Sequence, residues 1–236
     1  MANIIITGAS SGIGFETVLD LTANKNNNVI ALARSADKLR RLHEIASDLN
    51  FDGGKLYPAQ FDIVYDNYVD SLIPFIKSKF DKVDILINNA GALINKSFLD
   101  TSAEEFGYML QTNVLGHVNM IKYIAPLMTE GGHIVNISSM GGFQGSVKFA
   151  GLSAYSASKG ALAVLTECLA EEFKDKNIKV NCLALGSSQT EMFEEAFPGL
   201  EAGTLAFEMG RYVSEFAQNG SKYYNGKVLP VSNTTP

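Results

Sequence analysis

The stretch NIIITGASSGIGFET, residues Asn3 to Thr17, decides the fold of this chain. It begins with three isoleucines, a β-branched run whose length is typical of a strand buried on both faces. Gly8, Gly12 and Gly14 follow with the spacing G-x-x-x-G-x-G, and apolar residues then recur at helical spacing. The stretch therefore predicts a strand, a glycine-rich turn and a helix in immediate succession.

The predicted turn has the properties of a phosphate-binding element. Glycines allow positive φ angles and remove the Cβ atoms that would hold a ligand away from the backbone. The free N–H groups at the start of the following helix, together with the helix dipole, favour an anion there. We therefore expect the pyrophosphate of a dinucleotide at this turn, although the spacing differs from the commoner G-x-G-x-x-G fingerprint. A tight turn without a ligand is the alternative.

The composition indicates one α/β domain and excludes several classes of function. The chain has 236 residues, 46% of them hydrophobic, which is enough for a sizeable core. Its net charge of −6 gives no electrostatic case for nucleic acid or an anionic membrane. Cys168 and Cys182 lie in apolar patterns and are expected to be reduced thiols in the core, and no histidine spacing predicts a metal site. Because a strand starts at Asn3 and no apolar run could span a bilayer, a cytoplasmic location is expected.

The residue after the second predicted strand, 29–33, bears on the choice of cofactor. An acidic residue at this place would bind the adenosine ribose and would repel a 2′-phosphate. Arg34 follows that strand instead, and a guanidinium can pair bidentately with a phosphate. The sequence therefore favours NADP(H) over NAD(H), and a solvated loop arginine is the alternative.

Strands and helices alternate along the rest of the chain, which implies a parallel sheet with right-handed crossovers. Pro74 predicts a kink in one of these helices or a late start of it, and Asn113 with Gly116 predicts a local distortion in the next. Strands are expected at 4–6, 29–33, 55–61, 83–87, 132–137, 178–185 and 226–231. After the first helix, further helices are expected at 36–49, 67–80, 102–128 and 153–173, with short helices within 190–216.

Tyr155 and Lys159 stand four residues apart in a predicted helix, so they share one helical face. A nearby ammonium stabilises a phenolate and lowers the pKa of a tyrosine. The pair can therefore act in acid–base catalysis at a carbonyl oxygen near neutral pH. A hydroxyl from the end of the preceding strand, at Ser138 or Ser139, can hold the same oxygen while it gains negative charge.

These motifs resemble those of the classical short-chain dehydrogenase/reductase family. TGASSGIG at 7–14, NNAG at 88–91, the serine pair and YSASK at 155–159 occur in the family's order. The resemblance implies a single-domain Rossmann fold over 1–236, a doubly wound parallel seven-stranded sheet, and a short helical substrate lid at 190–216. It also implies an NADP(H)-dependent enzyme that interconverts a carbonyl and an alcohol.

By this resemblance the catalytic tetrad is Asn113, Ser139, Tyr155 and Lys159. Tyr155 would be the acid–base, Lys159 would also bind the nicotinamide ribose, and Ser139 would orient the substrate carbonyl. The main chain of Asn113 would bind a water that extends a proton relay. The interval from Ser139 to Tyr155 is longer than is usual in the family, which places extra residues in the loop 143–151 and leaves Ser138 as the alternative serine.

The resemblance also implies a set of cofactor contacts. Asp62 would hydrogen-bond the adenine amino group, with a turn aspartate as the alternative, and Thr190 would contact the nicotinamide carboxamide. Leu185 stands where the family usually has proline, before the retained Gly186. The full predicted set is Gly8, Ser10, Ser11, Gly12, Ile13, Gly14, Arg34, Asp62, Ile63, Asn89, Ala90, Gly91, Tyr155, Lys159, Gly186 and Thr190.

The expected partners are a small-molecule carbonyl or alcohol substrate and further copies of the chain. The helices at 102–128 and 153–173 resemble those that pair across subunits in the family, so a homodimer or homotetramer is expected. A 3-oxoacyl thioester is one candidate substrate. The alternatives for function are an NAD(H)-dependent dehydrogenase of the same family and a catalytically silent dinucleotide-binding sensor or scaffold.

Overall fold

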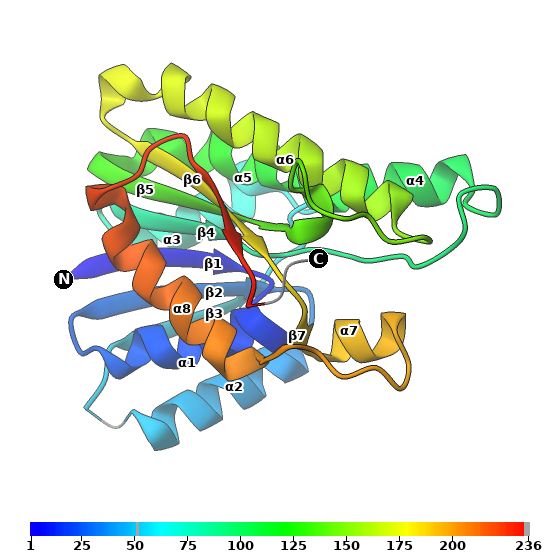
Figure 1. Ribbon diagram of the computed structural model, residues 1–236. Coiled ribbons are helices and arrows are strands. Elements are labelled where there is room, and N and C mark those ends of the chain that lie inside the picture. The colour runs from blue at the N-terminus through cyan, green and yellow to red at the C-terminus, as the bar shows by residue number, and fades with distance from the viewer. Residues whose placement is uncertain (51, 234–236) are drawn as a thin grey trace.

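The computed structural model describes residues 1–50 and 52–233 and has one parallel sheet at its centre. The strands are β1 (Ala2–Thr7), β2 (Asn27–Ala33), β3 (Lys55–Gln60), β4 (Val83–Asn88), β5 (Met128–Ser139), β6 (Lys179–Leu185) and β9 (Val228–Val231). Their order is β3-β2-β1-β4-β5-β6-β9, so the winding reverses between β1 and β4 (Figure 1). The predicted doubly wound, seven-stranded parallel sheet is confirmed. The predicted domain covers 1–236, of which residues 51 and 234–236 lie outside the described part.

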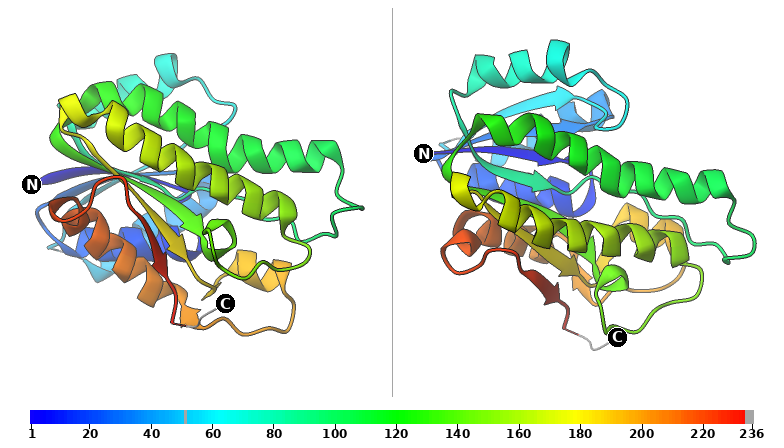
Figure 2. Two further views of the ribbon diagram at one scale, coloured as in Figure 1. Left: turned by 45° about the horizontal axis from the view of Figure 1, so that its top comes forward. Right: turned by 90° about the horizontal axis from the view of Figure 1, so that it is seen from above.

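Helices cover both faces of this sheet. They are α1 (Gly12–Ala23), α2 (Ala36–Leu49), α3 (Ile73–Lys79), α4 (Ala103–Leu110), α5 (Gly116–Ile124), α6 (Ser153–Glu172), α7 (Glu191–Ala196) and α8 (Ala206–Asn219). Helices α1, α2 and α8 pack on one face, and α3, α5 and α6 pack on the other (Figure 1). Helices α4 and α5 continue one another beside α6 (Figure 2). Within the described ranges, no helix is both long and apolar enough to cross a membrane.

The isoleucine run of β1 forms the centre of both hydrophobic layers. Ile4 and Ile6 belong to the core beneath α1, α2 and α8, whereas Ile5 belongs to the core beneath α3, α5 and α6. Full burial of one such side chain contributes about 1.5 to 3 kcal/mol to folding. Because β1 pairs with β2 on one side and β4 on the other, its carboxyl end lies at the middle of the sheet edge.

The two helices predicted to be irregular contain π-helical turns. One π-helical turn spans Tyr68–Leu72 and leads directly into α3, whose first turn contains Pro74. The other spans Gln111–Leu115 between α4 and α5, so the distortion predicted around Asn113 is confirmed. Turns of this kind are frequent at functional sites. The short 3₁₀ turns are Ala125–Leu127, Met140–Gly142, Lys174–Lys176 and Gly220–Lys222.

The structure differs from the predicted elements most clearly before β5 and within 190–216. The helix predicted to reach Met128 ends earlier, because Met128 already pairs with Val83 of β4 and begins β5. The region 190–216 contains one short helix, α7, but its second half belongs to the 14-residue helix α8. Helix α8 packs against α1, so it is part of the core layer. The sequence also did not predict the small pair of strands β7 (Ser188–Gln189) and β8 (Thr204–Leu205).

Candidate active site

The glycine-rich turn connects β1 to α1 at the carboxyl edge of the sheet. Gly8 has a φ angle of +67°, and a Cβ atom there would lie 2.7 Å from the Cα atom of Ala90. A Cβ atom on Gly14 would lie 2.3 Å from the main-chain oxygen of Gly8. Ser11 precedes α1 without a capping hydrogen bond from its side chain in the described structure. The turn therefore has glycines without side chains, and no side chain caps the main-chain amides at the start of α1. This arrangement fits a phosphate group.

The asparagine motif after β4 is tied directly to this turn. The Asn89 side-chain amide donates to the main-chain oxygens of Thr7 and Gly8 at 3.0 and 3.1 Å. The Thr7 hydroxyl accepts from the main-chain amides of Asn89 and Ala90, both at 3.0 Å. These bonds hold the ends of β1 and β4 together. They bring the two motifs into one site, beside Ser10, Gly12 and Ile13 of the turn.

The ends of β2 and β3 carry the residues predicted to contact the adenosine. Arg34 is exposed, and its side chain has no ion pair or hydrogen bond within the described part of the chain, so it is available to a ligand. One Asp62 side-chain oxygen accepts from the main-chain amide of Val64 at 2.8 Å, which is the geometry of a turn aspartate. Ile63 is buried against Gly116 at the start of α5.

Tyr155, Lys159 and Ser139 meet where β5 ends and α6 begins. The Lys159 ammonium nitrogen lies 5.9 Å from the centre of the Tyr155 ring and donates to the main-chain oxygen of Ile137 at 2.8 Å. Ser139 lies close enough to Tyr155 to favour the phenolate and so to lower the pKa of Tyr155. The predicted sharing of one helical face is therefore confirmed, and the serine completes the cluster from the neighbouring strand.

Burial controls the protonation of this cluster. It lowers the pKa of Lys159, which is only 4% exposed, to about 8. It also raises the pKa of Tyr155, and the nearby Ser139 opposes that rise. The expected lowering of the tyrosine pKa by Lys159 is therefore wrong for the chain alone. The physical reason is that desolvation of the phenolate outweighs the distant ammonium.

Asn113 uses its side chain to connect three segments. Its side-chain oxygen accepts from the main-chain amide of Ala92 at 2.8 Å. Its side-chain amide donates to the main-chain oxygen of Ala92 at 3.0 Å and to the Ser158 hydroxyl at 2.9 Å. A Cβ atom on Gly91 would lie 3.2 Å from the Asn113 side-chain oxygen and 3.4 Å from the Lys159 ammonium nitrogen. Asn113 and Lys159 are therefore neighbours around Gly91, as the predicted site requires.

The structure distinguishes the two serines at the end of β5. The Ser138 hydroxyl is buried and donates to the main-chain oxygen of Lys159 at 2.8 Å, so it is engaged away from Tyr155. Ser139 is the serine beside Tyr155. Gly142, three residues beyond Ser139, packs so tightly on α6 that a Cβ atom would lie 2.5 Å from the main-chain nitrogen of Gly160.

The segment after β6 reaches back to the glycine-rich turn. The Gly186 amide donates to the main-chain oxygen of Val231 at 2.8 Å, which continues the pairing of β6 with β9. The side chain of Thr190 lies 3.1 Å from where a Cβ atom on Gly12 would stand. The Thr190 hydroxyl also accepts from the main-chain amide of Phe193 and caps α7. The residue predicted to contact the nicotinamide, Thr190, therefore lies beside the glycine-rich turn.

A sequence model of the short chain dehydrogenase family matches residues 2–201. The chain belongs to the short-chain dehydrogenase family. An uncharacterized oxidoreductase of Staphylococcus aureus is 31% identical over 188 residues, which are 79% of this chain and 78% of that protein. The oxidoreductase BOA17 of Botryotinia fuckeliana is 28% identical over 225 residues, 94% of this chain and 78% of that protein. This dehydrogenase thus shares most of its length with oxidoreductases.

Solved structures of short-chain dehydrogenases superimpose on almost the whole chain. One from Serratia marcescens has a TM-score of 0.85 at 27% identity, covering 98% of this chain and 96% of that one. One from Burkholderia cenocepacia, in complex with NADP, has a TM-score of 0.85 at 25% identity, covering 99% and 97%. The L-sorbose reductase of Gluconobacter frateurii, complexed with NADPH and L-sorbose, has a TM-score of 0.86 at 22% identity, covering 99% and 96%.

The sequence did not predict several residues that support the site of this short-chain dehydrogenase. Asn136, a polar residue in the otherwise apolar run of β5, accepts from the Asn88 side-chain amide at 2.9 Å and donates to Thr166 of α6 at 2.9 Å. Ser158 anchors Asn113. In retrospect, polar residues in the middle of buried runs were the available signal, because buried polar groups require partners.

Among the remaining His and Cys side chains, His117, His133 and Cys182 are buried, whereas Cys168, which was expected in the core, is exposed. His133 is buried and bonds the main-chain oxygen of Ala217 at 2.8 Å and the Asn181 side chain at 3.0 Å. Burial lowers its pKa to about 4. His117 is buried near the main-chain oxygen of Ala90, and burial together with the charge of Lys159 lowers its pKa to about 3. The described residues contain no group of three His, Cys, Asp or Glu side chains placed to hold a metal ion.

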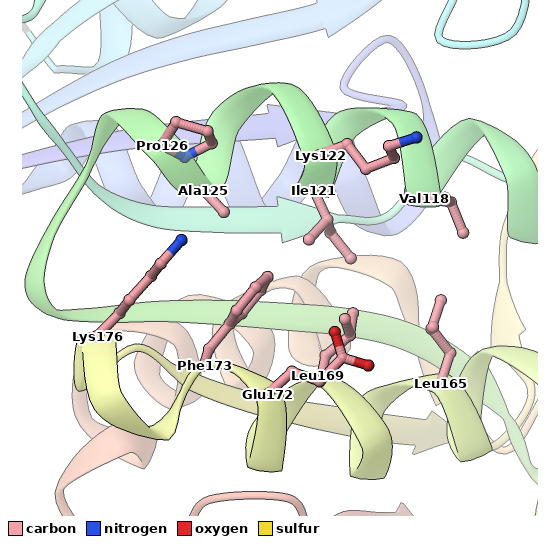
Figure 3. Close-up of a pocket in the computed structure, with 10 residues that line it drawn as sticks. All are labelled: Val118, Ile121, Lys122, Ala125, Pro126, Leu165, Leu169, Glu172, Phe173 and Lys176. Carbon is pink, nitrogen blue, oxygen red and sulfur yellow. The ribbon is translucent and has the colours of Figure 1, made fainter.

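Two surface hollows of the dehydrogenase lie outside this cluster. One, of about 630 Å³, is lined by the loop 143–151, Phe98 and the outer face of the start of α6. The other is a groove between α5 and the far half of α6 (Figure 3). Figure 3 shows Ile121 and Val118 facing Leu165, Leu169 and Phe173 across it. Both hollows are mainly apolar, and the second lies at the opposite end of α6 from Tyr155.

Proposed function

We propose that this short-chain dehydrogenase is an NADP(H)-dependent oxidoreductase that interconverts a carbonyl and an alcohol of a small molecule. The observation that carries the proposal is the Tyr155, Lys159 and Ser139 cluster at the carboxyl edge of the sheet. Asn113 and Gly91 connect that cluster to the glycine-rich turn through the segment after β4. A proton donor and a dinucleotide site thus share one edge, which is the arrangement that hydride transfer requires.

The residues present fit the proposed cofactor. The bare turn of Gly8 to Gly14 and the uncapped start of α1 would hold the pyrophosphate. The exposed Arg34 has no partner of its own among the described residues, and it would pair with the 2′-phosphate. The NADP complex of the Burkholderia cenocepacia relative supports this preference. When bound, the nicotinamide would supply or accept the hydride.

The chain itself would supply the proton and hold the reacting oxygen. In the direction of reduction, the Tyr155 hydroxyl donates its proton to the carbonyl oxygen as negative charge develops there. Because burial raises the pKa of Tyr155, the hydroxyl keeps its proton at neutral pH until that moment. Ser139 donates a hydrogen bond to the same oxygen. The ammonium of Lys159 stabilises the tyrosinate that remains, and Asn113 holds the segment 91–101 against α6.

The direct test is oxidation of NADPH and NADH, measured in parallel with the purified protein. Ketones, aldehydes and 3-oxoacyl thioesters would be offered separately, so that turnover identifies the class of carbonyl substrate. We expect turnover with NADPH to exceed turnover with NADH. A preference for NADH would remove the role given to Arg34. Tight binding of NADPH without turnover on any substrate would favour the alternative function, a catalytically silent dinucleotide-binding sensor or scaffold.

We also propose that the chain forms a homodimer or homotetramer through α4, α5 and α6. Val164 of α6 is 60% exposed and Leu115, just before α5, is 46% exposed. The apolar groove of Figure 3 lies between the same helices. Apolar surface concentrated on adjacent elements is typical of a subunit interface.

A further inference from the structure

Helix α7 is fastened at its two ends to separate parts of the chain. At its first residue, the Glu191 carboxylate pairs with the Lys38 ammonium of α2 at 2.6 Å. At its last residue, the main-chain oxygen of Ala196 accepts from the Asn95 side chain at 2.8 Å. Figure 1 shows α7 beyond the carboxyl ends of the strands, on the side of α2. The helix therefore connects the segment after β4 to the start of α2.

The Lys38 end of this connection lies at the proposed adenosine side of the cofactor site. Lys38 is in the first turn of α2, three residues after the helix-capping Ser35 and four residues after Arg34. Thr190, the neighbour of Glu191, lies against Gly12 of the glycine-rich turn. The Lys38 ammonium therefore stands between the start of α2 and that turn, where the phosphates of a dinucleotide would be held.

We propose that Glu191 is a cofactor-specificity residue that acts through Lys38. This inference rests on the proposed use of NADP(H). In the chain alone, Lys38 pairs with Glu191. With NADP(H) bound, Lys38 pairs with the 2′-phosphate, and the first turn of α7 is released. NAD(H) has no phosphate at this position, so the Lys38–Glu191 pair persists.

The charges and exposures favour such an exchange of partners. The Lys38 and Glu191 side chains are 49% and 62% exposed, and ion pairs in water contribute little to stability. A phosphate carries more negative charge than a carboxylate and is a stronger acceptor for an ammonium. Glu191 also places a negative charge beside the incoming phosphate, and like charges repel. The carboxylate therefore competes with the 2′-phosphate for one lysine.

The test is the affinity of Glu191→Gln for NADPH and NADH, measured by direct titration of cofactor fluorescence. We expect Glu191→Gln to bind NADPH about twofold to fivefold more tightly than the original chain, which is the range that an exposed ion pair can shift. Its affinity for NADH should not change. Glu195→Gln is the matched control, because Glu195 carries the same charge on α7 without an ion pair in the described structure. In a Lys38→Gln background, Glu191→Gln should no longer affect NADPH binding.

Hydrogen exchange of α7 gives a readout that does not depend on affinity. Amides at 191–196 should exchange faster with saturating NADP than with saturating NAD. Equal NADPH affinity of Glu191→Gln and the original chain would overturn the inference, as would an equal gain in Glu195→Gln or for NADH. If the original chain binds neither dinucleotide, the proposed function falls and this inference falls with it. If the original chain prefers NADPH but Glu191→Gln leaves the affinity for NADPH unchanged, only the inference about Glu191 is overturned.

Discussion

Lys159 is the ionisable side chain whose surroundings determine most of the chemistry at the site. Its ammonium is buried, its nearest hydrogen-bond partner is the main-chain oxygen of Ile137, and no carboxylate contacts it in the described structure. Burial therefore lowers its pKa from 10.5 to about 8. Between these two values the unfolded chain binds more protons at this site than the folded chain, so this lysine makes the free energy of unfolding rise with pH. Below pH 8 the whole cost of the buried charge is present.

Replacement of Lys159 by methionine should separate activity from stability. Lys159→Met removes a buried charge, so we expect the free energy of unfolding at pH 7 to increase by about 1 to 2 kcal/mol. The loss of the hydrogen bond to Ile137 offsets part of the gain. We expect kcat/KM to fall by about 100-fold or more, because the tyrosinate loses its stabilising charge.

Urea unfolding between pH 7 and 10.5, together with steady-state kinetics, measures both effects. Lys55→Met is the matched control, because Lys55 is exposed on β3. The control should leave activity and the pH dependence of stability unchanged. A Lys159→Met variant that is less stable than the original chain at pH 7 would mean that burial of the ammonium does not lower the free energy of unfolding.

At the scale of elements, the glycine-rich turn approaches the end of β4 so closely that it leaves no room for an added methyl group. Gly14→Ala would place a Cβ atom 2.3 Å from the main-chain oxygen of Gly8 and 2.4 Å from the Asn89 side-chain nitrogen. We expect this variant to lose at least about tenfold in dinucleotide affinity, because the turn must move to admit the methyl group. Titration with NADPH measures the loss.

Gly107→Ala is the contrasting substitution within a helix. Gly107 lies inside α4, and a Cβ atom there would have no neighbour within 4 Å. Alanine should therefore stabilise the chain by about 0.5 to 1 kcal/mol through helix propensity and leave cofactor affinity unchanged. If Gly14→Ala bound NADPH as tightly as Gly107→Ala, the glycine-rich turn would not be the pyrophosphate site.

Periodicity and turn residues predicted most elements, because their causes are local. The isoleucines of β1 and the glycine spacing at the start of α1 each act within a few residues. The early start of β5 was not predictable in this way, because Met128 joins the strand by pairing with Val83 of a different element. Helix α8 was also misjudged, since its place in the core depends on packing against α1.

The candidate site was also predictable only where its geometry depends on spacing within one element. Tyr155 and Lys159 share a face because four residues separate them in one helix. The preference for Ser139 over Ser138 follows from the structure, which shows that Ser138 bonds the main chain of α6. The pair Lys38–Glu191 joins residues 153 positions apart, and only the tertiary path of the chain brings them together.

At the scale of the whole molecule, exposed apolar side chains lie on each of the helices α4, α5 and α6, among them Tyr108, Tyr123 and Val164. Val164→Lys places a charge at the centre of the proposed contact between subunits. Because a charge buried at an interface without a partner is costly, we expect this variant to sediment as a monomer while the original chain sediments as a dimer or tetramer. Leu49→Lys, on the opposite helical layer at the end of α2, is the matched control and should not change the oligomeric state. A monomeric original chain would contradict the proposed assembly.

The whole fold converges on one edge of the sheet, where the glycine-rich turn, the segment after β4 and the start of α6 meet. We propose that Tyr155 transfers the proton there. The most direct measurement compares Tyr155→Phe with the original chain, recording the dissociation constant for NADPH and the rate of NADPH oxidation on the same carbonyl substrate. Tyr223→Phe, at an exposed tyrosine, is the control. We expect Tyr155→Phe to bind NADPH within about twofold of the original chain and to lose at least about 100-fold in kcat, because only the proton donor is removed. Turnover by Tyr155→Phe at the original rate would contradict the account.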